Sequence, residues 1–373
     1  MRKLKQGIFV VIFTMCAGGI LMLANCRSHL IKDTDSYYIS GTKKEKEYLE
    51  SLFTLLQQDK KNTEINSGTI TKDSSKGSAE RFAIVREIAN VYKRQNNYGR
   101  LINFLSEWVD EHPEDSYNTY YLFMVAYSYI QQETYSVAKL YFNLIVKNYS
   151  DLIVKNESIH LLCLKQLIEV EDNPQQKIWY YEELISRFKD KIDLGVTWFL
   201  LGQTYEQVGD WQRAIQSYSE FLPFYGVVVP GFPDAYGYAK QMVDFENSLK
   251  NWTFESLGSL VGTIKSALDE GNTWQLWQYR ARVNFFARSW AQAGSEDSGM
   301  AEFNLSAFGS SAKLRYSDNL SRDSNANEAY LRTWGWSQFT PIWYFYFRKI
   351  YFPLDPAIHG RWEWAGVYYG EKF

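Results

Sequence analysis

Cysteine, histidine and proline are scarce in this chain of 373 residues, which contains 3 cysteines, 4 histidines and 8 prolines. So few cysteines exclude a small fold held together by disulfides. The histidines, His29, His112, His160 and His359, form none of the spacings typical of a transition-metal site. We therefore expect no metal and no other cofactor.

Motifs for catalysis and phosphate binding are also absent. Neither GxGxxG nor GxxxxGK[ST] occurs, and residues 335–339 (GWSQF) fall short of the nucleophile elbow GxSxG. Adjacent acids such as Asp269 and Glu270 lie beside glycine, where a solvated turn is the ordinary interpretation. Because no nucleophile, base and orienting group can be named together, we expect a protein that is not an enzyme.

The chain has no excess of positive charge. It carries 40 Lys and Arg against 43 Asp and Glu, a formal net charge of −3, which is not the basic surface that nucleic acid requires. It is also 46% hydrophobic and 17% aromatic, enough to exclude global disorder and to fill more than one core. A nucleic-acid partner is therefore not expected.

The N-terminus has the layout of a targeting segment. Residues 1–7 are basic and residues 8–23 are almost wholly apolar, as in the n-region and h-region of a secretory signal. A permanent transmembrane helix is the alternative, but the apolar run contains Gly18 and Gly19 and is shorter than the ~20 residues that span a bilayer. The pattern favours a signal.

The end of this segment, Leu23-Ala24-Asn25-Cys26, resembles the bacterial lipobox. Asn25 departs from the usual Gly, Ala or Ser, a looseness known from spirochaetal lipoproteins. The resemblance implies a signal peptide over 1–25, a diacylglycerol-linked Cys26, a polar tether over 26–43, and a periplasm-facing protein that is lipid-anchored to a membrane of the bacterial cell envelope. Cys163 lies in an apolar run and is expected to be a buried thiol.

The middle of the chain is predicted to be helical and repetitive. Residues 44–58 form an amphipathic stripe, and residues 59–79 lack an apolar period and predict a solvated loop. Similar segments then recur at intervals of roughly 37–39 residues, a period typical of solenoid repeats. They begin at Phe82, Thr119, Ser158 and Gly195.

The fourth segment carries the pattern W-x2-L-G-x2-Y…A-x3-F, and the second matches it nearly as well. The matching residues of the fourth are Trp198, Leu201, Gly202, Tyr205, Ala214, Tyr218 and Phe221. This resembles the tetratricopeptide repeat (TPR), as found in TPR lipoproteins of the bacterial envelope. The resemblance implies a TPR-like domain over 44–222, with paired helices stacked into a solenoid, that acts as a protein-protein interaction scaffold in envelope assembly or transport.

The repeat pattern also predicts local packing. Gly202 is expected where the two helices of a repeat meet, and Gly209-Asp210 is expected to form the turn between them. Partner contacts are expected on first-helix positions that the register points away from the second helix. These positions are Phe123, Gln203 and Glu206.

The last third of the chain is predicted to be a different domain. Prolines and glycines predict a linker over 223–236. Residues 237–373 are predicted to form an aromatic-rich α+β domain with a curled, mostly antiparallel sheet. Residues 238–292 read as helices, and the order of elements weakly resembles a nuclear-transport-factor-2-like cone. The predicted strands are 302–308, 312–317, 328–336, 341–352 and 361–369.

Aromatic rings with a few polar groups in this domain are the candidate ligand surface, although most such rings are expected to be core. The candidates are Trp334, Trp336, Tyr344, Tyr346, Arg348, Arg361, Trp362 and Trp364. Glu363 is expected to pair with an arginine across the strands. A ligand-binding, or less favoured enzymatic, C-terminal module positioned by the repeats is thus the alternative to the scaffold.

Overall fold

The computed structural model describes residues 37–66, 74–290, 314–336 and 341–372. The chain divides into two compact units, residues 1–132 and 133–373. Cys26 and the predicted strand 302–308 lie outside the described residues.

The first unit is helical where it is described. Its helices are α2 (Lys43–Asn66), α3 (Ser74–Arg94), α4 (Tyr98–Glu111) and α5 (Asn118–Gln131). The loop predicted over 59–79 is wrong for 59–66 and 74–79, which are helical. A helix extends past its anchoring apolar residues because propagation is easy once a helix has nucleated, and residues 59–66 contain no glycine or proline.

Residues 37–43, predicted to be part of the tether, belong to the folded unit. The Tyr38 side chain is buried, and its hydroxyl donates to Glu107 at 2.6 Å. The Tyr92 hydroxyl in turn donates to the backbone carbonyl of Tyr38 at 2.7 Å. An aromatic side chain supplies the apolar surface that the surrounding polar residues lack, so it docks this segment onto α3 and α4.

The second unit begins with five more helices. They are α6 (Tyr135–Asn148), α7 (Ile159–Val170), α8 (Pro174–Phe188), α9 (Leu194–Gln207) and α10 (Trp211–Phe221), with a short 3-10 turn η2 (Lys189–Lys191) after α8. The four predicted repeat starts fall in or next to α3, α5, α7 and α9, and a second helix comes after each of them. The predicted positions of the helix pairs are therefore confirmed.

One strand pair interrupts the helices, although the middle of the chain is predicted to be helical. β1 (Ile153–Val154) pairs antiparallel with β2 (Glu157–Ser158). The two residues between them, Lys155 and Asn156, have φ angles of 53° and 65°, the conformation of a two-residue hairpin turn. The repeat period carries no signal for such an insertion.

Helix ends in the fourth repeat are set by local chemistry. The Asp193 and Asp210 side chains cap α9 and α10 by accepting from backbone N–H groups inside each helix. Gly209 has a φ of +77°, so the predicted Gly209-Asp210 turn is confirmed. Gly202 lies against the ring of Tyr218, as expected for the small residue between the two helices.

The rest of the second unit is mixed. Its helices are α11 (Ala235–Asn247), α12 (Leu257–Asp269) and α13 (Thr273–Tyr279), and its strands are β3 (Phe286–Ser289), β4 (Arg315–Tyr316), β5 (Glu328–Trp334), β6 (Ile342–Lys349) and β7 (Trp362–Tyr369). These strands form a five-stranded sheet of order β3-β7-β6-β5-β4. β3 runs parallel to β7, and the other neighbours are antiparallel.

The strand predictions for 328–336, 341–352 and 361–369 are confirmed by β5, β6 and β7. β4 falls within the predicted strand 312–317, of which residues 312–313 lie outside the described residues. The helical prediction for 238–292 is wrong at β3. This short strand exists through its pairing with β7, a partner far along the chain whose influence no local pattern reports.

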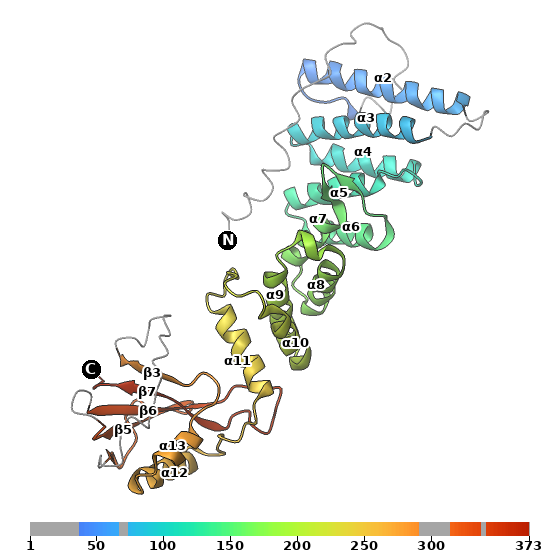
Figure 1. Cartoon of the computed structure of the whole chain (residues 1–373). Helices are drawn as coiled ribbons and strands as arrows, with labels where there is room; N and C mark the ends of the chain where they lie inside the picture. Colours follow the sequence, from blue (N-terminus) through green and yellow to red (C-terminus); the bar gives the residue numbers. More distant parts are fainter. Residues whose placement is uncertain (1–36, 67–73, 291–313, 337–340, 373) are drawn as a thin grey trace. The chain divides into compact units, whose positions relative to one another are not determined.

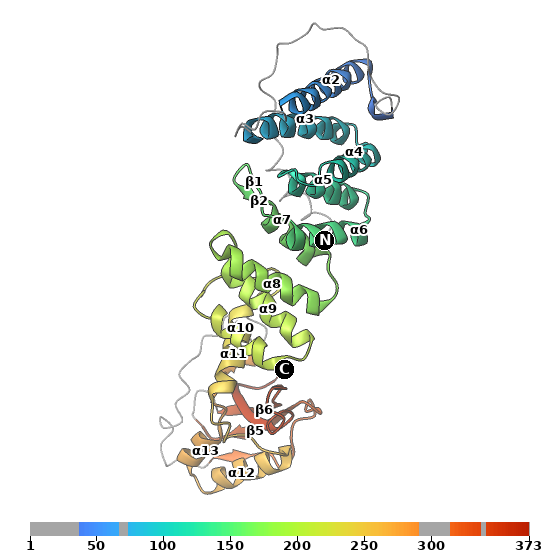
Figure 2. The ribbon, with the colours of Figure 1, turned by 90° about the vertical axis from the view of Figure 1, so that its right-hand side faces the viewer.

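The two faces of the sheet differ. One face packs against α12 and α13, as Figure 2 shows, and forms a core with Leu260, Ile264, Phe345 and Trp364. The other face carries a smaller aromatic cluster, whose buried members are Tyr330, Tyr344 and Tyr368. Both faces are therefore built largely from aromatic side chains.

A larger core joins the last repeat to the C-terminal part of the chain. Phe221 of α10, Phe245 of α11 and Trp252 share this core with Ile350 and Phe352, which come directly after β6. The segment 223–236, predicted as a linker, thus connects residues that are packed together. The fourth repeat and the sheet region are parts of the same unit.

Candidate functional site

A groove crosses the fourth repeat. It has a volume of about 310 Å³, and its walls come from α8 and α10 with α9 as the floor. Its lining residues are Glu182, Ile185, Ser186, Trp198, Leu201, Tyr205, Arg213, Gln216 and Ser217. Leu201 and Tyr205 are buried beneath it, whereas Ile185 and Trp198 are partly exposed in it.

Polar contacts fix one end of the groove. The Tyr205 hydroxyl donates to a Glu182 carboxylate oxygen at 2.5 Å. The Arg213 guanidinium lies over the Tyr205 ring at 4.6 Å and forms an ion pair with Asp210 at 2.6 Å. Burial, together with the hydrogen bond to Glu182, raises the pKa of Tyr205 to about 12. The hydroxyl therefore remains a donor at neutral pH.

The charge balance of the groove depends on these contacts. Arg213 is neutralised by Asp210, and in the described part of the chain no cation pairs with Glu182. The groove therefore presents a carboxylate that has no cation partner among the described residues, next to apolar surface from Ile185 and Trp198. Such a surface suits a segment with an apolar side chain next to a basic group or an amide donor.

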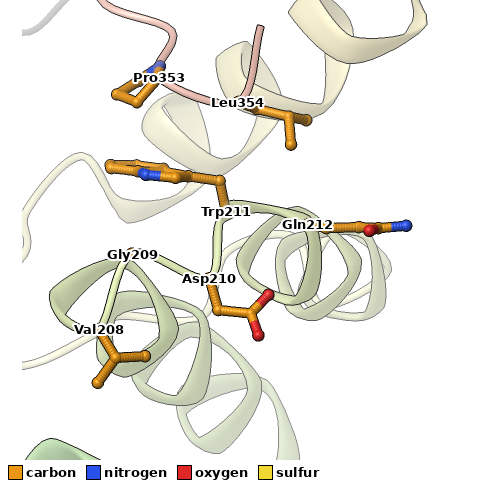
Figure 3. A pocket seen from close by; sticks show the side chains of 7 residues that line it. All are labelled: Val208, Gly209, Asp210, Trp211, Gln212, Pro353 and Leu354. Carbon is orange, nitrogen blue, oxygen red and sulfur yellow. The ribbon is translucent and has the colours of Figure 1, made fainter.

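A second hollow lies nearby, where the α9–α10 turn meets the segment after β6 (Figure 3). Its volume is about 470 Å³, and it is lined by Val208, Gly209, Asp210, Trp211, Gln212, Pro353 and Leu354. The Trp211 ring lies on the side of Pro353, and the Asp210 carboxylate points away from it. Asp210 already caps α10 and pairs with Arg213, which leaves Gln212 as the other polar side chain of this lining.

The three predicted partner-binding residues lie elsewhere. Phe123 is buried in α5. The Gln203 amide donates to the Tyr218 hydroxyl at 2.7 Å, and Glu206 accepts from that hydroxyl at 2.7 Å. The expectation that Gln203 and Glu206 point away from the second helix is therefore wrong.

Glu206 is also bound to the helix that comes after the repeat. Its carboxylate accepts from the Tyr238 hydroxyl of α11 at 2.8 Å. Burial raises the pKa of Glu206, although both tyrosine hydrogen bonds act in the opposite direction. The repeat pattern could not show this because α11, the partner helix, is not part of the repeat.

The predicted ligand residues are not brought together. Trp336, Trp362 and Trp364 are buried in the core beneath α12, whereas Tyr344 and Tyr346 belong to the opposite face. Trp334 is partly exposed, with Arg332 over its ring at 5.4 Å. The eight side chains therefore do not line a common cavity.

The two arginines of that set have structural partners. Arg348 pairs with Glu363 across β6 and β7 at 2.8 Å, which confirms the predicted cross-strand ion pair. Glu363 also accepts from the Trp252 indole at 2.9 Å. Arg361 donates to the backbone carbonyl of Thr253 at 2.9 Å.

Other types of site find little support in the fold. Within the described ranges, no group of His, Cys, Asp and Glu side chains could hold a metal ion. None of the described helices combines the length and the hydrophobicity needed to cross a membrane. Cys163 is buried and free, as predicted.

Sequence reasoning identified the floor of the groove through Trp198, Leu201 and Tyr205, but missed its walls. Glu182 and Ile185 belong to the degenerate third repeat, where the pattern is too weak to set a register. A family model of the tetratricopeptide repeat matches residues 197–222, which cover most of α9 and all of α10. No curated protein matches the chain. The chain therefore contains a tetratricopeptide repeat, and the groove is built on it.

Proposed function

We propose that this protein is an interaction scaffold whose α8–α10 groove binds a segment of a protein partner. The observation that carries the proposal is the partly exposed pair Ile185 and Trp198 beside Glu182, on a recognised tetratricopeptide repeat. Such repeats generally bind protein partners through the extended surfaces of stacked helices. The groove offers a partner an apolar floor and the Glu182 carboxylate as a hydrogen-bond acceptor, but no catalytic arrangement of side chains.

We further propose where the scaffold works. The basic start, the apolar run 8–23 and the sequence up to Cys26 support export and lipid attachment in a bacterial envelope, facing the periplasm. A diacylglycerol anchor holds a protein on a membrane more firmly than one acyl chain. The partner in this proposal is an envelope protein engaged in assembly or transport.

The groove is tested by photocrosslinking in cells. A photoreactive residue at Gln216, on the exposed wall of α10, should capture the partner, and one at Lys240, exposed on α11, should not. Glu182→Arg and Trp198→Ala should each lower capture about 5- to 30-fold, which corresponds to 1–2 kcal/mol. Unchanged capture by both variants would contradict the groove as the binding site.

A second candidate rests on the sheet face opposite α12. There Arg288 stacks over Phe286 at 4.4 Å and donates to the Tyr368 hydroxyl at 3.2 Å, and no described acid pairs with it. This unneutralised cation among aromatic rings supports a ligand-binding C-terminal module, as does the weak resemblance to a nuclear-transport-factor-2-like cone. Capture that survives the groove variants but is lost in Arg288→Ala would favour this module.

A further inference from the structure

The connection between α10 and α11 exposes apolar side chains. Residues 222–233 (LPFYGVVVPGFP) contain no charged residue. Tyr225 and Val228 are each 82% exposed, and Phe232 is 37% exposed. Isolated apolar residues on a surface are ordinary, but a contiguous uncharged apolar protrusion marks an interaction site.

The exposure does not come from poor packing of the loop. Val229 is buried, and Phe224 and Val227 pack against the core shared by α9, α10 and α11. Two backbone hydrogen bonds stabilise the turns, from the N–H of Val227 to the carbonyl of Phe224 and from the N–H of Phe232 to the carbonyl of Val229. Inward and outward side chains thus alternate along a well-held loop.

Tyr225 illustrates this arrangement. Its ring lies edge-on against Tyr236 of α11, with ring centroids 5.1 Å apart. Tyr236 lies in the first turn of α11, a helix labelled in Figure 1, so the Tyr225 side chain is held beside the start of that helix while most of its surface remains exposed. A tyrosine held this way presents an apolar ring and a polar hydroxyl, the combination enriched at membrane–water interfaces.

The shape and charge of the loop indicate what covers it. Side chains that project from a convex loop need a partner with a matching cavity, whereas the fluid headgroup–acyl boundary of a bilayer adapts to any convex shape. Exposed acids, Glu220 and Asp234, flank the uncharged run, so attraction to anionic lipid is not the driving force. The loop fits the surface of a zwitterionic bilayer.

We infer that residues 222–233 form a hydrophobic wedge that inserts Tyr225 and Val228 into the headgroup–acyl boundary of a lipid bilayer. The inference rests on the membrane attachment proposed above. A few side chains give only reversible adsorption by themselves. On a chain that is tethered to the same membrane, insertion becomes intramolecular and is favoured by the high effective concentration.

The test uses the full chain reconstituted with phosphatidylcholine vesicles that contain an alkyne-bearing phosphatidylcholine. A photoreactive benzoylphenylalanine is placed at position 225 or 228, and at position 216 or 240 as exposed controls in the same unit. The expected result is a lipid adduct at 225 and 228 and none at the controls. Adding phosphatidylglycerol or salt should leave the adduct unchanged.

Vesicle flotation of the unsubstituted chain and of Cys26→Ala distinguishes insertion of the wedge from attachment through the lipid at Cys26. If the chain floats but positions 225 and 228 give no more lipid adduct than 216 and 240, the proposed insertion of the wedge is contradicted, whereas lipid attachment at Cys26 is supported. If Cys26→Ala floats as well as the unsubstituted chain and the adduct at 228 persists, the lipid anchor fails and the wedge stands. A protein adduct at 228 in place of the lipid adduct also overturns the wedge.

Discussion

Gly202 of α9 faces Tyr218 of α10 so closely that a Cβ atom at position 202 would lie 2.6 Å from Cε1 of the tyrosine ring. Tyr218 cannot simply swing aside, because its hydroxyl is held by Gln203 and Glu206. The absence of a side chain at this position therefore sets the distance between the two helices of the repeat.

This relationship predicts that Gly202→Ala destabilises the protein by about 1–3 kcal/mol, the usual cost of overpacking. Gly262→Ala is the matched control, because it also lies inside a helix but a Cβ there has nothing within 4 Å. Removing a helical glycine at such an open position should stabilise by about 0.5–1 kcal/mol. Chemical denaturation measures both, and equal effects of the two substitutions would show that the contact is unimportant.

Glu206 gives a prediction about pH. Because burial raises the pKa of Glu206 above its ordinary value of 4.5, the folded state keeps this proton to a higher pH than the unfolded chain does. The contribution of Glu206 to the free energy of unfolding therefore falls as pH rises from about 4.5 through the folded pKa, and it levels off above that.

Glu206→Gln stays neutral at every pH and still offers an amide oxygen to Tyr238. Its free energy of unfolding therefore lacks the decrease with pH that the Glu206 carboxyl causes. The stability of Glu206→Gln relative to the parent chain should thus increase between pH 4 and pH 8 in denaturant titrations. Parallel stability curves for the two proteins would rule out titration of Glu206 in this interval. Charge reversal at Glu206 and Phe123→Ala should each lower the stability of the chain, because Glu206 is hydrogen-bonded to α11 and Phe123 is buried.

The ion pair of Arg348 and Glu363 predicts a non-additive pair of substitutions. Glu363 is fully buried, so Arg348→Met leaves an uncompensated buried carboxylate and should cost about 3–5 kcal/mol. Changing both residues to Met removes that charge and should cost less than Arg348→Met alone. A double-mutant cycle from thermal or chemical unfolding measures this, and additive losses would mean that the pair is not coupled.

The lipid anchor is tested by metabolic labelling. An alkyne fatty acid should label the parent chain and fail to label Cys26→Ala, because the proposed acylation requires that thiol. The buried Cys163 serves as an internal control, since Cys163→Ala should keep the label. Equal labelling of the Cys26→Ala chain would contradict lipid attachment at Cys26.

The sequence predicted the helix pairs because the repeat pattern encodes their packing. Gly202, Ala214 and the Gly209 turn are small or flexible for reasons that act within one repeat. The aromatic strands β5, β6 and β7 were visible for a similar reason, since each is a continuous run of strand-favouring residues between turn signals.

Features that depend on distant partners could not be predicted. β3 is a strand because β7 pairs with it, and the Glu182 wall of the groove comes from a repeat whose pattern has decayed. The aromatic candidates were divided between two faces of the sheet, which a list of aromatic residues cannot show. In each case the deciding contact joins segments that are separate in the sequence.

The core that α10 and α11 share with the segment after β6 constrains the order of events on the ribosome. Translation adds roughly 5–20 residues per second, and domains generally fold as they emerge. Phe245 stacks on Phe352 at 5.6 Å, yet Phe352 is synthesised more than a hundred residues after Phe245. Until residues 350–352 have been synthesised, α10 and α11 lack these core partners, so nascent chains stalled before residue 350 should be preferred substrates for chaperones and proteases.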